Sequence, residues 1–247
     1  PAGGSAEVAV EAMCPADATW AKPAELAMRY AVAGTPWSGA ITVPVLTVQR
    51  IPADAPGRPA DFAIAKPDQV VNFFEADPAQ QANVWKGPQD CSAQVWLARG
   101  DGRLRIRVAV RDDVHHQAGP AQDSWRGDGI QLAIQVPGQV GFWEVGAARG
   151  NDGAALSHVW IRPKDGALQA ADVTVTTAMR DGGLDYDIAI PLTGLGIDDA
   201  ALERGVRFNL IVNDNDGGLR EGFVRIAPGI GERKDPAQFP LVRLQAP

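Results

Sequence analysis

Trp125 has the clearest potential for chemistry in this sequence, because polar residues flank it on both sides. GPAQDS precedes this tryptophan and RGDG follows it, where a polar turn leads into an apparent strand. A ring in such a loop can cover the apolar face of a sugar, while neighbouring donors and acceptors bond the hydroxyls. The chain has seven tryptophans against two tyrosines, so most of them must be core. We expect Trp96 and Trp160, which lie within apolar strands, to be packing residues.

Groups for catalysis are sparse. No GxSxG, HExxH, GxxxxGK or strand-linked GxGxxG motif is present. His115 and His116 are adjacent, and on a strand they would point to opposite faces, which disfavours a shared metal ion. An enzyme stays open as an alternative, because the carboxylates of Asp112, Asp113 and Asp128 could converge in a groove.

The run NDNDGG at residues 213–218 places oxygen ligands at alternate positions before a glycine, as in half of a calcium loop. The later bidentate Glu is missing at the proper spacing, and Asn/Asp-Gly runs form good turns. We therefore expect a turn and no cofactor, with Asp214 and Asp216 as the ligands if calcium does bind. The two cysteines, Cys14 and Cys91, allow one disulfide or two buried thiols, and Cys91 should point into the core.

The composition sets limits on the partners. The chain has 247 residues, 45% of them hydrophobic, and a net charge of -7 with scattered Lys and Arg. This charge disfavours nucleic acid and an anionic membrane, because both attract basic patches, so a neutral or weakly charged ligand fits better. No run approaches the roughly twenty apolar residues that span a bilayer, and we expect a soluble protein.

Short alternating runs indicate the fold that carries these residues. In RLRIRVAV (103–110) apolar side chains share one face and arginines the other, and IQLAIQV (130–136) repeats the pattern with Gln131, Ala133 and Gln135 on the wet face. DVTVTTAM, LDYDIAIPL and VRFNLIVND continue it, separated by DG, GG and PG turns. We predict an all-β fold, an antiparallel β-sandwich of two packed sheets of jelly-roll or immunoglobulin-like type.

Helical signals and a boundary complete the organisation. Residues 21–30 could form a turn or two of helix, and residues 198–205 have an acidic start and a Gly stop. The Pro-, Ala- and Asp-rich stretch at 51–69 predicts a connector, with a boundary near residue 66. Residues 1–66 would then be a β-rich extension and linker, and residues 67–247 the sandwich.

Several motifs along residues 67–247 resemble those of a known family. They are W-x-G-P-x-D-x-S-A (Trp85 to Ala93), V-x-D-D-x-H (Val110 to His115), S-W-x-x-D-x-x-x-L (Ser124 to Leu132), Y-D-I-A-I-P (Tyr186 to Pro191), F-N-L-I-V-N-D (Phe208 to Asp214) and D-P-A-Q-F (Asp235 to Phe239). Their order and spacing resemble family-nine carbohydrate-binding modules and related DOMON-like sandwiches. The resemblance implies a sandwich without catalysis of its own, attached to a secreted or periplasmic polysaccharide-degrading enzyme.

The resemblance also assigns roles to residues. Such modules hold a saccharide between two Trp rings, and Trp125 matches the first ring and Gln131 the polar strand position. Arg233 falls where the second ring is expected, Glu144 near the place of an Arg, and Ile211 on a polar position. An Arg can stack on a ligand and pair with a carboxylate, so Arg233 could favour an acidic sugar, or the substitution could mean lost binding.

Three hypotheses follow. The first is a noncatalytic carbohydrate-binding module for a poly- or oligosaccharide, with Trp125 stacking, Gln131 and Asn213 hydrogen bonding, and Glu144 and Arg233 selecting the ligand. The second is a structural domain that packs on a catalytic domain of the same or a neighbouring chain, with Trp125 as an interface anchor. The third is a haem sandwich, which the positions of the three methionines, Met13, Met28 and Met179, disfavour.

Overall fold

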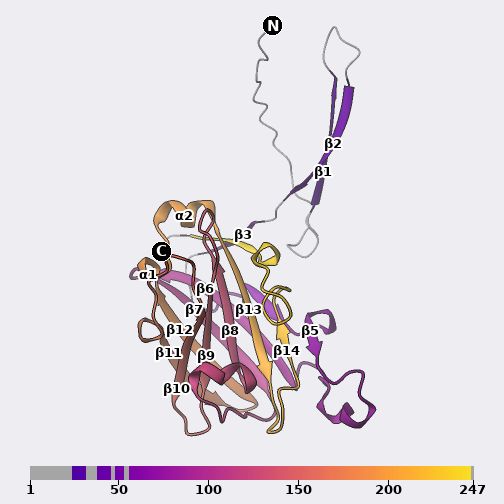
Figure 1. Cartoon of the computed structure of the whole chain (residues 1–247), viewed down its shortest axis with the longest axis vertical. Helices are drawn as coiled ribbons and strands as arrows, with labels where there is room; N and C mark the ends of the chain where they lie inside the picture. Colours follow the sequence, from indigo (N-terminus) through magenta and orange to yellow (C-terminus); the bar gives the residue numbers. More distant parts are fainter. Residues whose placement is uncertain (1–23, 32–37, 46–47, 53–55, 246–247) are drawn as a thin grey trace. The chain divides into compact units, whose positions relative to one another are not determined.

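The computed structural model of the chain describes residues 24–31, 38–45, 48–52 and 56–245. The chain divides into two compact units, Pro1–Val48 and Gln49–Pro247, which are treated separately below. In the first unit β1 (Ala24–Ala31) and β2 (Ser38–Val45) form an antiparallel hairpin (Figure 1). The helical turn predicted at 21–30 is therefore wrong, because β1 pairs along its whole length with β2, and this pairing outweighs a weak helix propensity.

The second unit contains two sheets (Figure 1). The eight-stranded sheet has the order β10 (Ala155–Ile161), β9 (Trp143–Arg149), β8 (Gly129–Gln135), β13 (Val206–Asp214), β14 (Gly222–Arg225) and β5 (Val70–Asn72), with β15 (Leu241–Leu244) pairing β13 and β3 (Val48–Ile51) pairing β15. The five-stranded sheet has the order β11 (Thr174–Arg180), β12 (Gly183–Pro191), β7 (Arg103–Asp112), β6 (Cys91–Gly100) and β4 (Phe62–Ile64). All strand pairs of this unit with a described register are antiparallel, so the predicted β-sandwich is confirmed.

The helices of the second unit are short. They are α1 (Leu192–Leu195), α2 (Asp199–Arg204) and the 3-10 helices η1 (Pro67–Gln69), η2 (Pro78–Asn83), η3 (Ala121–Arg126), η4 (Ala170–Asp172) and η5 (Pro236–Gln238). The helix predicted at 198–205 is confirmed as α2, since the Asp198 carboxylate accepts from the Ala201 amide and Gly205 ends the helix at φ 96°. In the described residues no helix is long and apolar enough to span a membrane.

Alternating side chains of both sheets build the shared core. On β7 the four apolar residues from Leu104 to Val110 are buried while Arg105 and Arg107 are exposed, as the pattern predicted. Phe62 of β4 and Phe208 of β13 lie 6.3 Å apart between ring centroids, which joins the two sheets. Cys91 is buried at the start of β6, as expected, and is a free thiol, whereas Cys14 lies outside the described residues.

The opposite face of the large sheet is covered in part. Gln131 and Ala133 of β8, predicted to be wet, are only 4% and 0% exposed, so that prediction is wrong. A second apolar cluster covers this face and contains Ala133, Phe142, Ile211, Phe223, Ile230 and Phe239. Ile230 and Phe239 come from the segment between β14 and β15, which folds over the sheet. The polar residues of this face are therefore usable only where the covering segment leaves an opening.

Two short strands precede the predicted boundary at residue 66. β4 pairs β6 with Phe62 opposite Val95, and the Gln245 amide donates to the Ile51 carbonyl of β3 at 2.9 Å. Both strands of the stretch 48–64 thus contribute to the sheets of the second unit.

Candidate functional site

Trp125 lies in η3, directly before β8, and its side chain is 37% exposed. The Arg126 guanidinium lies 4.8 Å from the centroid of this ring, and the Arg220 guanidinium lies 6.0 Å from it. A tryptophan of this exposure is not a core residue. The polar sequence on both sides of Trp125 therefore marks an accessible ring rather than an interior one.

A buried glutamine fixes the backbone of η3. Gln117 is 1% exposed, and its Nε2 donates to the carbonyls of Ser124 and Asp128, each at 2.8 Å. Gly127 passes close above this side chain, because a Cβ atom there would lie 2.8 Å from Gln117 Oε1. Only glycine allows the chain to approach this closely. The residues on either side of Trp125 are thus bonded to one side chain.

Two further side chains hold η3 from other elements. Asn215, just after β13, donates through Nδ2 to the Arg126 carbonyl at 2.8 Å. Trp160 of β10 donates through Nε1 to the Gln122 carbonyl, also at 2.8 Å. The backbone that carries Trp125 is therefore held by three separate segments of the chain, which reduces the conformational entropy that η3 would lose on binding a ligand.

A pocket of about 310 Å³ opens beside Trp125. The side chains that line it include Trp125, Gln131, Glu144, Trp160, Arg220 and Lys234. Trp160 was predicted to be core, and this is wrong: it is only half-buried and lines the pocket. β10 is an edge strand with an irregular register between Val159 and Ile161, which leaves the ring on the open face over Gly146.

Gln131 and Arg220 of the pocket share a buried polar partner, Asn213, and this group is incompletely bonded. Asn213 Oδ1 accepts from Gln131 Nε2 at 3.0 Å and from the Arg220 guanidinium at 2.5 Å. Among the described residues, the buried donors Asn213 Nδ2 and Arg220 Nε have no acceptor. Burial lowers the pKa of Arg220 to about 10, and the nearby Glu144 carboxylate opposes this shift. Buried donors without partners are favourable places for ligand hydroxyls.

Glu144 of β9 faces a lysine that the sequence did not single out. Lys234 Nζ donates to Glu144 Oε1 at 2.7 Å. Burial raises the pKa of Glu144, and the hydrogen bond from Lys234 partly offsets that shift. Arg233, the sequence candidate for this segment, is exposed and does not line the pocket, whereas its neighbour Lys234 does.

The structure thus brings together four of the five candidates, Trp125, Gln131, Glu144 and Asn213, and leaves Arg233 outside. Three further residues were missed. Trp160 is two residues after the polar His158 and so lies on the same face of the strand, a signal that could have placed it on the open face. Lys234 adjoins a chosen residue, and Arg220 has no local signal, since only the pairing of β14 with β13 brings it to the pocket.

A second cluster contains carboxylates. Ligand atoms of Asp112, Asp214 and Asp216 lie within 4.8 Å of one another, and so do those of Asp90, Asp113 and Asp216. Asp214 is 6% exposed, and within the described part of the chain no hydrogen bond or ion pair reaches its carboxylate. Burial and the neighbouring carboxylates raise its pKa to about 9. Burial raises the pKa of Asp112 to about 7, with a further contribution from Asp128. Lys86 Nζ lies 4.0 Å from Asp216.

His115 joins part of this cluster without His116. β7 ends at Asp112, so the two histidines do not lie on a strand. His115 Nδ1 is 3.4 Å from Asp128 and 3.9 Å from Asp112, while Nε2 donates to the Arg149 carbonyl. The nearby Asp128 carboxylate raises the pKa of His115, against the effect of burial. Asp112 and Asp128 do converge, but both are buried and neither lines a described pocket.

The three methionines considered as haem ligands lie in different places. Met179 is 53% exposed, Met28 lies in β1 of the first unit, and Met13 lies outside the described residues.

Comparison with known proteins places this fold. The family described as "Carbohydrate family 9 binding domain-like" matches residues 71–246. A family 9 carbohydrate-binding module from Caldicellulosiruptor kristjanssonii in complex with glucose is similar at 16% identity and a TM-score of 0.50, over 80% of this chain and 96% of that one. The same organism's module in complex with cellotriose is similar at 14% identity and a TM-score of 0.52, over 81% and 95%. No curated protein matches the chain. The family match covers most of the sequence, and the chain therefore belongs to the carbohydrate family 9 binding domain-like family.

Proposed function

We propose that the second unit binds an oligosaccharide in the pocket lined by Trp125 and Trp160. The observation that carries this proposal is an accessible indole beside buried donors that lack acceptors. A sugar has apolar faces that suit such a ring and hydroxyls that suit such donors. The similar modules whose structures contain glucose and cellotriose support the same class of ligand.

Each lining group has a role in this proposal. Trp125 and Trp160 cover apolar sugar faces, Gln131 and Arg220 donate to hydroxyls, and the Glu144 carboxylate accepts from one. The pocket volume of about 310 Å³ is at the lower end of the range for ligand sites, so it fits one terminal sugar and part of the next. With one well-exposed ring, the affinity should lie between micromolar and millimolar.

The wider setting is also part of the proposal. A noncatalytic module of this kind works beside a polysaccharide-degrading catalytic domain, of the same or a neighbouring chain, in the secreted or periplasmic space. Its role there is to keep the enzyme near its substrate. The residues that converge outside the pocket, Asp112 and Asp128, are too buried to act on a polymer.

Calcium fits the carboxylate cluster. Asp112, Asp214 and Asp216 offer hard oxygen ligands close together, and Asp214 has no other partner among the described residues. A bound calcium ion would supply charge neutralisation between these strands and loops and so stabilise the fold. Replacing Asp214 by Asn removes the carboxylate charge and keeps the size of the buried side chain, so the variant tests calcium binding apart from packing. Without calcium D214N should be as stable as the parent or more so, and only the parent should gain stability on adding calcium.

Titration calorimetry with glucose and cellotriose tests the sugar site. Truncation of a ring that dominates an interface removes about 2 kcal/mol, so Trp125→Ala should weaken binding about thirtyfold. Trp125→Phe keeps a stacking face and should lose less. Val140→Ala, at a position 80% exposed, is the control and should bind as the parent does. A folded W125A protein with parental affinity would contradict the proposal.

One observation favours a structural role instead. Trp125 also lines a second pocket of about 520 Å³, together with the exposed apolar side chains of Phe73 and Leu219. Such a group could anchor a protein partner. In that case the parent protein would bind neither sugar, and Leu219→Ala would weaken its association with the catalytic domain.

A further inference from the structure

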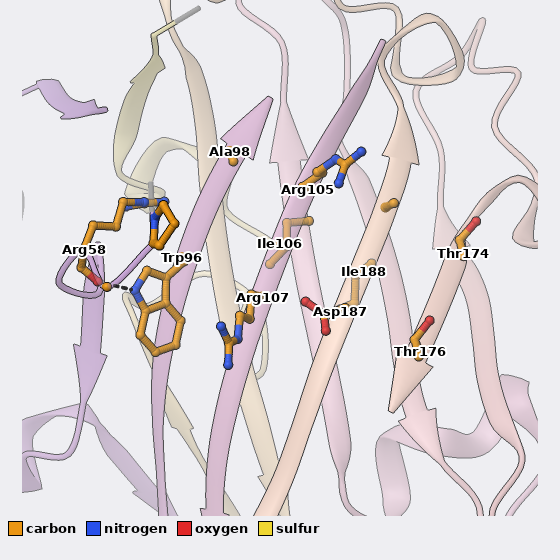
Figure 2. Close-up of a pocket in the computed structure, with 13 residues that line it drawn as sticks. Arg58, Trp96, Ala98, Arg105, Ile106, Arg107, Thr174, Thr176, Asp187 and Ile188 are labelled. Carbon is orange, nitrogen blue, oxygen red and sulfur yellow. Dashed lines mark hydrogen bonds between the residues drawn. The ribbon is translucent and has the colours of Figure 1, made fainter. Parts of the chain in front are cut away.

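A larger hollow lies on the outer face of the five-stranded sheet (Figure 2). Its volume is about 590 Å³. Trp96, predicted to be core, lines this hollow: that prediction is wrong, because the alternation of β6 turns Val95 and Leu97 inward and leaves Trp96 half-buried on the outer face. None of its lining residues belongs to the proposed sugar pocket.

The strand register puts four functional side chains in one row across this face. Trp96 of β6 pairs Arg107 of β7, Arg107 pairs Asp187 of β12, and Asp187 pairs Thr176 of β11. Adjacent strands lie about 4.8 Å apart, so the row is about 14 Å long. It offers a flat ring, a cation, a carboxylate and a hydroxyl in sequence, as Figure 2 shows.

The next row explains why the face is hollow. It runs from Ala98 through Arg105 and Ala189 to Thr174, so two of its four members are small. Trp96 Nε1 donates to the Arg58 carbonyl at 3.1 Å, which fixes the ring against the segment that forms one wall (Figure 2). The ring is therefore held in place where it lines the hollow.

The lining of this hollow includes three arginines and one aspartate, in a protein of net charge -7. Arg58 is already paired with the Asp61 carboxylate at 2.6 Å, so Arg107 is the arginine that matters most for a ligand. The Arg107 guanidinium is exposed and lies 5.5 Å from the Trp96 ring centroid. Within the described residues it makes no hydrogen bond or ion pair. Arg105 contacts Asp101 at 2.5 Å, but both side chains are exposed, so this pair exchanges easily with water or ligand.

From this arrangement we propose that the hollow is a second binding site, for an oligosaccharide that carries carboxylates, such as an oligouronate. The Trp96 ring covers the apolar face of one sugar, and the Arg107 guanidinium pairs with its carboxylate through two parallel hydrogen bonds. Thr176 and Asp187 bond hydroxyls of the sugars that follow along the row. A neutral sugar would use the ring and leave Arg107 without a partner, so charge gives this site its preference. The proposal does not depend on the Trp125 pocket.

Calorimetric titration of the whole chain with trigalacturonate tests this inference, with cellotriose as the neutral probe. We expect trigalacturonate to bind and its affinity to fall as salt is raised from 50 to 500 mM, because salt screens exposed charges. Trp96→Ala and Arg107→Gln should each weaken trigalacturonate binding at least tenfold. Arg107→Lys keeps the charge but not the paired geometry and should fall between the parent and R107Q.

The two sites separate cleanly in this experiment. Trp125→Ala should leave trigalacturonate binding unchanged, and R107Q should leave cellotriose binding unchanged. Melting curves confirm that each variant is folded. No binding of trigalacturonate to the folded parent, or parental affinity in both W96A and R107Q, would overturn the second site. Loss of trigalacturonate binding in W125A would assign it to the first pocket and also overturn the proposal. A protein partner on this face would give the first of these results.

Discussion

Replacing Gln117 by Ala should destabilise the protein and weaken sugar binding, although Gln117 does not line the Trp125 pocket. Its Nε2 holds the carbonyls of Ser124 and Asp128 at 2.8 Å each, and the side chain is almost fully buried. Each buried carbonyl left without a donor loses about 1 to 3 kcal/mol, so the two together lose about 2 to 6 kcal/mol. For a protein of this size that corresponds to a fall in melting temperature of about 4 to 24 °C.

Thermal and urea denaturation measure this loss, and the sugar titration measures the second effect. Because η3 carries Trp125, a folded Q117A protein should bind cellotriose more weakly even though every pocket side chain is present. Gln94→Ala is the matched control: Gln94 is exposed on β6, and its removal should change stability by less than about 0.5 kcal/mol. A Q117A melting temperature within about 1 °C of the parent would refute the assignment of Gln117 as the support of η3.

Two further predictions use the same assays. Gly146→Ala places a Cβ atom against the Trp160 ring, so the ring must move. The free energy of unfolding should fall by about 1 to 3 kcal/mol, and the tryptophan fluorescence should change. An unchanged spectrum would show that the ring lies elsewhere. With a chelator present, the free energy of unfolding measured by urea denaturation should fall as pH rises from 5 to 9. The raised pKa values of Asp112 (about 7) and Asp214 (about 9) make the folded state hold protons that the unfolded state releases. Stability that rises with pH would contradict this.

The sandwich could be predicted from the sequence because its strands carry a strict alternation. β7 shows this best, since one face meets the core and the other meets water along its whole length. β8 shows the limit of the argument. On its second face, Ala133 packs in a cluster with Ile230 and Phe239, which come from a segment about a hundred residues later in the chain. The local periodicity of a strand does not indicate whether a distant segment will pack over its second face. Strand β1 was missed for another reason, since its pairing with the following strand β2 outweighs local helix signals.

The candidate site was predictable only where a residue conflicts with its surroundings. Trp125 is such a residue, a large ring in a polar turn, and it is exposed. Trp96 and Trp160 occur in apolar runs, where sequence alone does not distinguish the two faces of a strand. The faces can be told apart only from polar residues two positions away, such as Gln94 and His158, which lie on the same face as the tryptophans. Arg220 could not be found at all, because its place depends on how β14 pairs with β13.

The two clusters of the second unit are joined by the residues that hold η3. Asp128 accepts from the Asn215 amide at 2.8 Å, and Asn215 in turn holds the Arg126 carbonyl beside Trp125. Asp214 directly precedes Asn215 in the chain, so an ion bound by Asp214 would restrain the segment that positions the ring. Calcium should therefore raise cellotriose affinity, by about fivefold for a typical coupling of 1 kcal/mol, in the parent and not in D214N. Equal affinities with and without calcium, in a parent protein that calcium does stabilise, would mean that the cluster supports the fold alone.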